Sequence, residues 1–196
     1  MDSFPAFFPM NGARVVVAGD GNMADAKAAL FIGSPAQVVR LRGPAAIDRR
    51  SYLGARLAFV AGDDPTFRKA AAAAAKAAHV PVNVVDDPAL CDFFTPAVID
   101  RGSVVVAVGT SGASPLLAAT LRDELEAHTP AAIGTLASLL GAHRDAIRSA
   151  FPDIGQRAEF LRAWMKGAAW RAGLAGDIDT ARRGLSDALA GHARVP

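Results

Sequence analysis

The chain has 196 residues and a formal net charge of +2, and 52% of its residues are hydrophobic. This length suits one domain or two small ones, and such a chain buries enough surface to fold without disulfides or a structural metal. A single cysteine, Cys91, excludes a disulfide framework, and the 4 histidines are too scattered to complete a zinc site with it. The small net charge and the lack of any Lys/Arg run argue against nucleic-acid binding.

The apolar residues are rich in alanine, and no stretch approaches the roughly 18 to 20 strongly apolar residues of a membrane span. Asp2 is an acid where a signal peptide carries basic residues, so we expect no export signal and a reducing cytoplasm. Arginine supplies most of the 21 basic residues. Either a GC-rich genome explains this excess, or the partner is rich in carboxylates or phosphates, which arginine binds in bidentate fashion.

Short apolar runs alternate with helical patterns in the N-terminal half of the chain. The runs lack polar alternation, which is typical of strands buried on both faces. Strands that alternate with helices indicate βαβ units and a parallel sheet. The strands are expected over residues 13–18, 37–41, 56–61 and 80–85, and the helices over 22–32 and 66–78.

After Pro88 the pattern changes. Two further extended runs, 97–101 and 103–108, are followed by Ser114 and Pro115, which predict the N-cap and first residue of a helix that ends near Ala127. From Pro130 onward the apolar residues recur at helical spacing. This pattern predicts an all-helical C-terminal part in which two tryptophans pack between helices. The expected helices cover 131–150, 154–172 and 178–190, and the tryptophans are Trp164 and Trp170.

The strongest motif is the glycine-rich turn from Gly19 to Ala24, which has the form GxGxxA and joins a predicted strand to a predicted helix. Gly19 permits the tight turn, Gly21 lets a pyrophosphate approach the backbone, and Ala24 lets the helix pack close to the strand. The motif indicates dinucleotide binding, with a purely structural turn as the alternative. The acid that usually holds the ribose is absent, and Arg40 or Arg42 would either favour a phosphorylated cofactor or be solvated.

Two further turns are candidates for function. Asp86 and Asp87 follow the strand at 80–85, where a carboxylate could act as a general base or both could be ordinary turn residues. The turn over residues 109–115 is either an anion-binding nest or a plain strand-to-helix turn. Asp63 and Asp64 precede Pro65 and are expected to cap the following helix, and Cys91 is expected to be packed rather than reactive.

The order of these motifs resembles the precorrin-2 dehydrogenase / sirohydrochlorin ferrochelatase family, whose modules complete siroheme. The resemblance covers essentially the whole chain, and the blocks from Asn83 to Pro115 are its most specific part. It implies an α/β fold with a Rossmann-like parallel sheet, a dimerisation segment and a small all-helical C-terminal domain, over residues 1–95, 96–129 and 130–196. The matching segments are residues 4–8, the Gly19–Ala24 turn with Lys27, and residues 81–93, 96–102 and 109–115.

The resemblance implies two reactions, NAD-dependent oxidation of precorrin-2 to sirohydrochlorin and insertion of ferrous iron to give siroheme. The Asp of the family's Asn-Val-Val-Asp motif is tied to both steps and falls on Asp86. A base beside the macrocycle suits both, because each step removes protons. The implied cofactor residues are Gly19, Gly21, Asn22, Met23, Ala24, Leu41 and Asp63, and the implied substrate residues are Asn83, Thr110, Ser111, Gly112 and Ser114, with no resident metal.

Two segments depart from the family pattern. The stretch from Arg42 to Arg56 is shorter, and the family's Ala-Thr-Asp-Asp reads Ala-Gly-Asp-Asp at residues 61–64. Both lie along the expected cofactor path, so a chelatase without dehydrogenase activity is one alternative and a non-catalytic tetrapyrrole- or nucleotide-binding protein is another. We expect a cytoplasmic homodimer that binds neither nucleic acid nor membrane, and that receives precorrin-2 from a separate methyltransferase because 196 residues leave no room for one.

Overall fold

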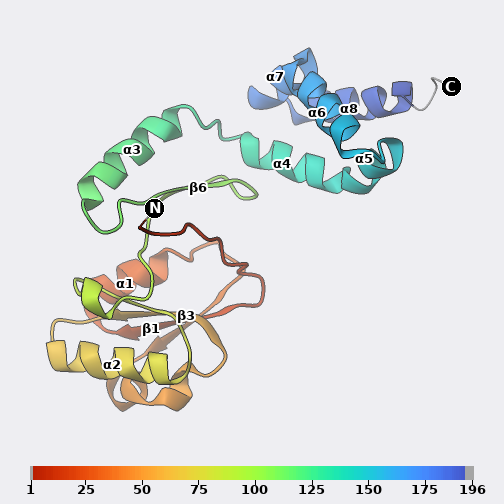
Figure 1. Ribbon diagram of the computed structural model, residues 1–196. Coiled ribbons are helices and arrows are strands. Elements are labelled where there is room, and N and C mark those ends of the chain that lie inside the picture. The colour runs from red at the N-terminus through yellow and green to blue at the C-terminus, as the bar shows by residue number, and fades with distance from the viewer. Residues whose placement is uncertain (1, 193–196) are drawn as a thin grey trace. The chain divides into compact units, whose positions relative to one another are not determined.

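The computed structural model describes residues 2–192, and the chain divides into two compact units (Figure 1). The first unit contains residues 2–95 together with 111–113, and the second contains residues 96–110 and 114–192. The α/β class with a helical C-terminal region is confirmed. The predicted boundary between residues 96–129 and 130–196 stays a prediction.

The first unit is built on a four-stranded parallel sheet. In spatial order its strands are β2 (Gln37–Leu41), β1 (Arg14–Gly19), β3 (Ala55–Ala61) and β4 (Val82–Val84). The chain runs from β1 to β2 on one side and then returns to place β3 and β4 on the other, so the strand order reverses between β1 and β3. Ligands of open parallel sheets bind at the carboxyl ends of the strands beside this switch point.

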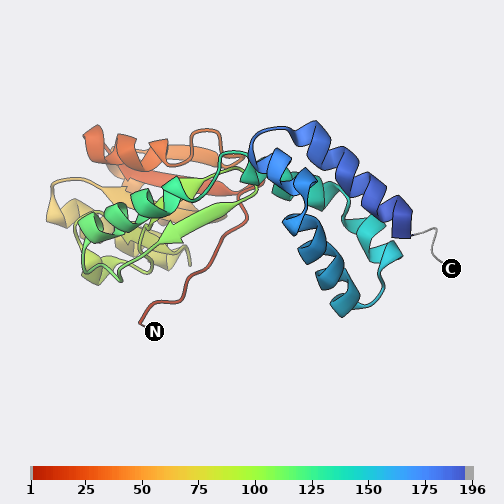
Figure 2. The same cartoon turned by 90° about the horizontal axis from the view of Figure 1, so that it is seen from above.

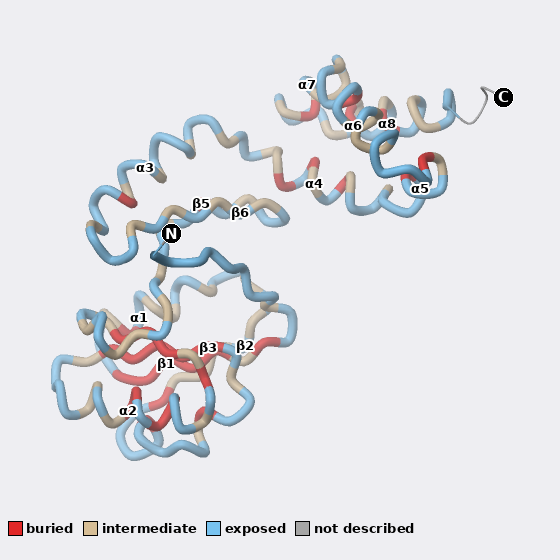
Figure 3. The backbone as a smooth tube through the Cα atoms, viewed as in Figure 1, coloured by how far each residue is buried: buried red, intermediate tan, exposed pale blue. Residues whose placement is uncertain are grey.

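One helix covers each face of this sheet, namely α1 (Gly21–Ala29) and α2 (Pro65–Ala77) (Figure 1). Val15, Val17 and Phe59 pack on the α1 side, whereas alternate strand residues pack on the α2 side. The central strands are therefore buried on both faces, as Figure 3 shows for β1 and β3. The predicted cap of α2 is confirmed, because Asp64 Oδ1 accepts the Thr66 N–H at 2.8 Å.

The segment between β2 and β3, for which the sequence predicts no element, forms two short 3-10 helices, η1 (Gly43–Ile47) and η2 (Arg49–Tyr52). Tyr52 holds them against the sheet: its side chain is fully buried, and its hydroxyl donates to the Ala46 carbonyl at 2.5 Å. Burial raises the pKa of Tyr52 to about 12. A single buried aromatic side chain therefore orders this short connection.

The second unit begins with an antiparallel pair, β5 (Ala97–Asp100) and β6 (Val105–Val108), followed by α3 (Pro115–Ala127). Ser114 caps α3 as predicted, since its Oγ accepts the Leu117 N–H at 3.2 Å. Arg101 ties the strand pair to the helix through an ion pair of 2.9 Å with Glu126.

Five helices complete the second unit (Figure 2). The prediction of two long helices is wrong. The helix predicted over residues 131–150 is divided in two at His143, and the helix predicted over residues 154–172 is divided in two at Gly167. His143 leaves helical geometry with ψ 5°, and Gly167 adopts an extended conformation with ψ 171°. Trp164 and Trp170 pack edge to face at 5.3 Å, as predicted. The helices are α4 (Ile133–Ala142), α5 (Arg144–Ala150), α6 (Ile154–Lys166), α7 (Ala168–Leu174) and α8 (Ile178–His192).

Some element ends also differ from prediction. The helix expected to reach Ile32 ends at Ala29, where α1 gives way to turns that lead to Gly33 in the left-handed region, with φ 79°. The strand expected over 80–85 is confined to β4, Val82–Val84. Over residues 2–192, no helix combines the length and apolar character needed to cross a membrane.

Tyr52 is the only tyrosine of the chain, so its ionisation can be followed directly by tyrosinate absorbance. Its pKa is about 12 in the folded state against 10.0 in an unperturbed chain, so the stability that the buried phenol contributes is present below pH 10 and lost as the pH rises toward 12. We predict a midpoint near 12 in the folded protein and near 10 in urea. Tyr52→Phe should lower the free energy of unfolding at pH 7 by about 1 kcal/mol. A titration midpoint near 10 for Tyr52 in the folded protein would contradict the burial of its side chain.

Candidate functional site

The switch point is closed by a tight approach of two backbones. Gly19, the last residue of β1, has φ 120°, and a Cβ at this position would lie 1.7 Å from the carbonyl oxygen of Ala61 at the end of β3. Only glycine allows both this conformation and this contact. The GxGxxA motif therefore begins where sequence analysis expects it, at the carboxyl edge between β1 and β3.

The start of α1 is left open toward a ligand. Gly21 has φ 73°, and a Cβ there would meet no atom within 4 Å. Asp20 is the N-cap, yet its side chain accepts no hydrogen bond from the helix backbone. The first N–H groups of α1 are thus not capped by Asp20, and with the positive end of the helix dipole they form a site suited to a phosphate. Ala24 is fully buried and lets α1 pack close to the sheet, so the turn fits a pyrophosphate.

Two arginines at the end of β2 bind acids of the glycine-rich turn and of α1. Arg40 Nη1 lies 2.6 Å from Asp25 Oδ1, and its Nη2 donates to the Gly19 carbonyl at 3.3 Å. Arg42 forms an ion pair with Asp20. Arg40 is therefore held in place rather than free in solvent, whereas the Arg42 side chain remains exposed in its ion pair. That they favour a phosphorylated cofactor stays a prediction.

The other predicted cofactor residues surround this turn. Leu41 is buried between the two arginines along β2, and Met23 packs in the core on the α1 side of the sheet. Asn22 and Asp63 are exposed, and the Asp63 carbonyl accepts a hydrogen bond from Arg68 at 3.0 Å. All of these belong to the first unit.

Asp86 follows β4 at the carboxyl edge and is exposed, with φ 57° in the left-handed region. Aspartate tolerates this conformation better than most residues. Asn83 is buried instead, and its amide donates to the Phe93 carbonyl at 3.0 Å. Cys91 is packed as predicted, with its Sγ 3.2 Å from the Val84 nitrogen. Asn83 and Cys91 thereby hold the loop that displays Asp86.

Sequence analysis assigns no role to Lys27, which lies on α1 near this loop. Its Nζ is 3.5 Å from Thr95 Oγ1 and 5.8 Å from the centroid of the Phe59 ring. Burial lowers the pKa of Lys27, while Cys91 and Asp86 act in the opposite direction. The signal was present in the sequence, because a lysine three residues after Ala24 falls on the inward face of α1.

The turn before α3 is built by its own side chains. Thr110 Oγ1 accepts the Ser114 N–H and donates to the Ser114 carbonyl, both at 3.1 Å. Ser111 and Gly112 have φ 51° and φ 83°, in the left-handed region. Successive backbone N–H groups in such turns form anion-binding concavities.

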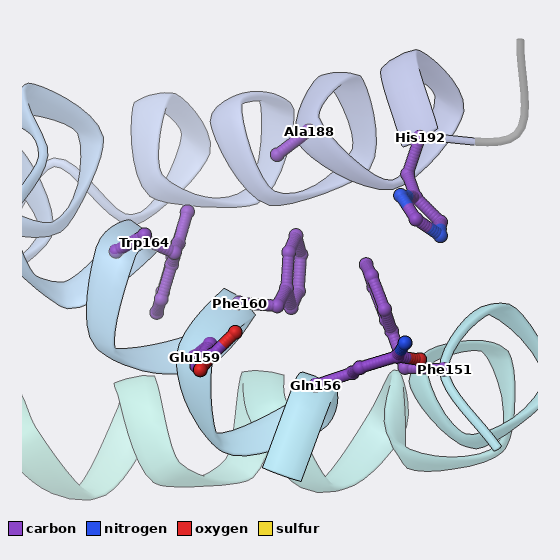
Figure 4. Close-up of a pocket in the computed structure, with 8 residues that line it drawn as sticks. Phe151, Gln156, Glu159, Phe160, Trp164, Ala188 and His192 are labelled. Carbon is purple, nitrogen blue, oxygen red and sulfur yellow. The ribbon is translucent and has the colours of Figure 1, made fainter. Parts of the chain in front are cut away.

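An open hollow of about 690 Å³ lies in the second unit between α6 and α8 (Figure 4). The rings of Phe151 and Phe160 stack with their centroids 4.6 Å apart. The centroid of the His192 ring lies 4.0 Å from that of Phe151. None of the predicted site residues lines this hollow. Within residues 2–192, no three His, Cys, Asp or Glu side chains are grouped to hold a metal ion.

A parallel sheet with a glycine-rich turn at its switch point, joined to a helical unit, defines a dinucleotide-binding protein of the Rossmann type. Two family models match the chain: one described as putative NAD(P)-binding over residues 6–97, and one described as sirohaem synthase dimerisation region over residues 132–189. The second match links the chain to siroheme synthases. The dimerisation match lies after residues 96–129, to which sequence analysis assigns that role.

Relatives and a solved structure agree with this assignment. The siroheme synthase of Pseudomonas putida is 38% identical over 93% of this chain and 43% of its own length, and that of Gluconacetobacter diazotrophicus is 37% identical over 96% and 45%. The chain thus spans less than half the length of these relatives. The structure of SirC, precorrin-2 dehydrogenase, matches the fold with a TM-score of 0.73 and 18% identity, over 95% of this chain and 98% of that one.

The contact at Gly19 can be tested against a matched glycine. Gly12 also has a positive φ, 66°, but a Cβ there would meet no atom within 4 Å. Gly19→Ala should lower the free energy of unfolding by at least about 3 kcal/mol, and Gly12→Ala by about 1 kcal/mol, in urea denaturation. Equal losses in the two variants would show that the approach to Ala61 is not a constraint.

Proposed function

We propose that this chain oxidises precorrin-2 to sirohydrochlorin with NAD and inserts ferrous iron to give siroheme. The similarity to siroheme synthases and the NAD(P)-binding description of residues 6–97 support this proposal. The relatives are named siroheme synthase, and the similar structure is named precorrin-2 dehydrogenase.

The observation that carries the proposal is the uncapped start of α1 above Gly19 and Gly21. Backbone N–H groups of Gly21, Asn22 and Met23 would hold the pyrophosphate of the cofactor, because the Asp20 side chain leaves them free. Leu41 and Asp63 would flank the rest of the dinucleotide. NAD, when bound, supplies the hydride acceptor for the oxidation.

Asp86 is proposed as the acid/base residue of both steps. The oxidation removes a hydride and a proton from precorrin-2, and Asp86 accepts the proton. Metallation replaces two pyrrole N–H protons with Fe²⁺, and an exposed carboxylate at the carboxyl edge can receive these protons one at a time and pass them to water. Asn83 positions the Asp86 loop beside the substrate.

The turn from Thr110 to Ser114 is proposed to bind carboxylates of the tetrapyrrole. Ser111 and Gly112 lie in the left-handed region, and turns of this kind can present backbone N–H groups that bind anions. The internal hydrogen bonds of Thr110 keep the turn in this shape.

A chelatase that works without NAD is the second candidate, and the ion pair between Arg42 and Asp20 favours it. This pair joins the glycine-rich turn to the end of β2, where the adenosine end of a dinucleotide would lie. Calorimetry distinguishes the two candidates: a chelatase alone would insert iron into sirohydrochlorin but show no heat of NAD binding.

We further propose a homodimer in the cytoplasm that receives precorrin-2 from a methyltransferase. The description of residues 132–189 as a dimerisation region supports self-association. The proposed contribution of residues 96–129 rests on α3, where Leu117, Leu121 and Leu125 are exposed at a spacing of four and share one face of the helix.

Asp86→Asn preserves size but removes the proton acceptor. We expect both sirohydrochlorin formation and iron insertion, followed by absorbance, to fall at least about 100-fold, while the affinity for NAD is unchanged. Asp87→Asn, one residue along the same loop, is the matched control and should retain the rate. Full activity of Asp86→Asn would refute its assignment.

The dimer can be tested on α3. Replacing Leu117 and Leu121 together with lysine puts two charges on the shared apolar face, and we expect sedimentation equilibrium to show a monomer where the wild type is a dimer. Ile32→Lys adds a charge at another exposed apolar side chain, 83% accessible, and should leave the dimer intact. A double variant that remains dimeric would exclude this face.

A further inference from the structure

Lys27 is an unusual lysine in the first unit, because its charged group is half-buried. The side chain runs from α1 to a cluster of three aromatic rings. In this cluster the centroid of the Phe59 ring lies 5.7 Å from that of Phe31 and 5.5 Å from that of Phe93. Its Nζ faces the Phe59 ring at 5.8 Å. None of the ion pairs found among residues 2–192 includes Lys27.

The polar contacts of this ammonium are few. Thr95 Oγ1 is its one hydrogen-bond acceptor among the described residues, at 3.5 Å, which is the long limit for such a bond. An ammonium carries three donors, so Lys27 retains capacity for a stronger acceptor. Burial disfavours the charged form and lowers the pKa of Lys27, and an anion would relieve this cost.

The position of Lys27 connects it with the proposed reaction. Asp86 and Cys91 are close enough to act electrostatically on its ammonium. Neither forms an ion pair with it, so the carboxylate of Asp86 remains free for proton transfer. The ammonium therefore acts electrostatically on the proposed acid/base residue without being paired to it, and its Nζ lies over the buried Phe59 ring.

We propose that Lys27 binds a peripheral carboxylate of the tetrapyrrole and so fixes the edge of the macrocycle beside Asp86. This inference rests on the proposed function, since precorrin-2 and sirohydrochlorin carry acetate and propionate groups. The half-buried ammonium binds a carboxylate more strongly than a surface lysine, because solvent screens the pair less.

Binding of metal-free sirohydrochlorin, followed by absorbance titration, tests the proposal. Lys27→Met keeps the length of the side chain and removes the charge, and it should weaken binding about 10- to 100-fold. Lys27→Arg should retain most of the affinity. Lys69→Met on the exposed face of α2 is the matched control and should bind as the wild type does.

Two further measurements separate the possible failures. The affinity for NAD by calorimetry should be the same in Lys27→Met and in the wild type, and its thermal midpoint should equal or exceed that of the wild type because a desolvated charge is removed. Wild-type protein that binds no sirohydrochlorin would overturn the proposed function itself. Wild-type affinity of Lys27→Met for sirohydrochlorin, or an equal loss of NAD binding, would overturn the role of Lys27 alone.

Discussion

The packing of the Gly19 backbone against the carbonyl of Ala61 is the constraint on which the carboxyl edge of the sheet depends. This contact joins β1 to β3 at the point where the strand order reverses. Because no side chain intervenes, α1 begins directly above the switch point. The same contact therefore fixes the glycine-rich turn on one side and, through β3 and β4, the loop of Asp86 on the other.

Charge is arranged around this edge in two different ways. Arg40 and Arg42 are paired with acids of the glycine-rich turn and α1, whereas Lys27 and Asp86 interact electrostatically but form no ion pair within residues 2–192. The arginine excess of the sequence has a partial explanation in the fold, since several guanidinium groups bind backbone carbonyls, as Arg14 does with Ser51 at 2.8 Å. The group that we propose for the anionic substrate is one of the few lysines.

Local signals in the sequence predicted much of the fold. The βαβ alternation gave the parallel sheet, and the Ser114-Pro115 and Asp64-Pro65 pairs marked helix starts that the structure confirms. What depends on tertiary packing was not predictable: the 3-10 helices held by buried Tyr52, and the interruptions at His143 and Gly167. Of the candidate site, the glycine-rich turn could be located, and the spacing from Ala24 was a signal for Lys27. Its contacts with Phe59 and Thr95 depend on tertiary packing and could not be predicted. The roles of the remaining residues stay predictions.

The most direct test of the central claim, that the Gly19–Ala24 turn holds the cofactor, is a crystal structure of the protein soaked with NAD. The account predicts that the pyrophosphate binds to the backbone N–H groups of Gly21, Asn22 and Met23, with Asp86 on the same side of the sheet as the nicotinamide. A dinucleotide bound elsewhere, with the Arg42–Asp20 ion pair intact and the turn empty, would contradict it.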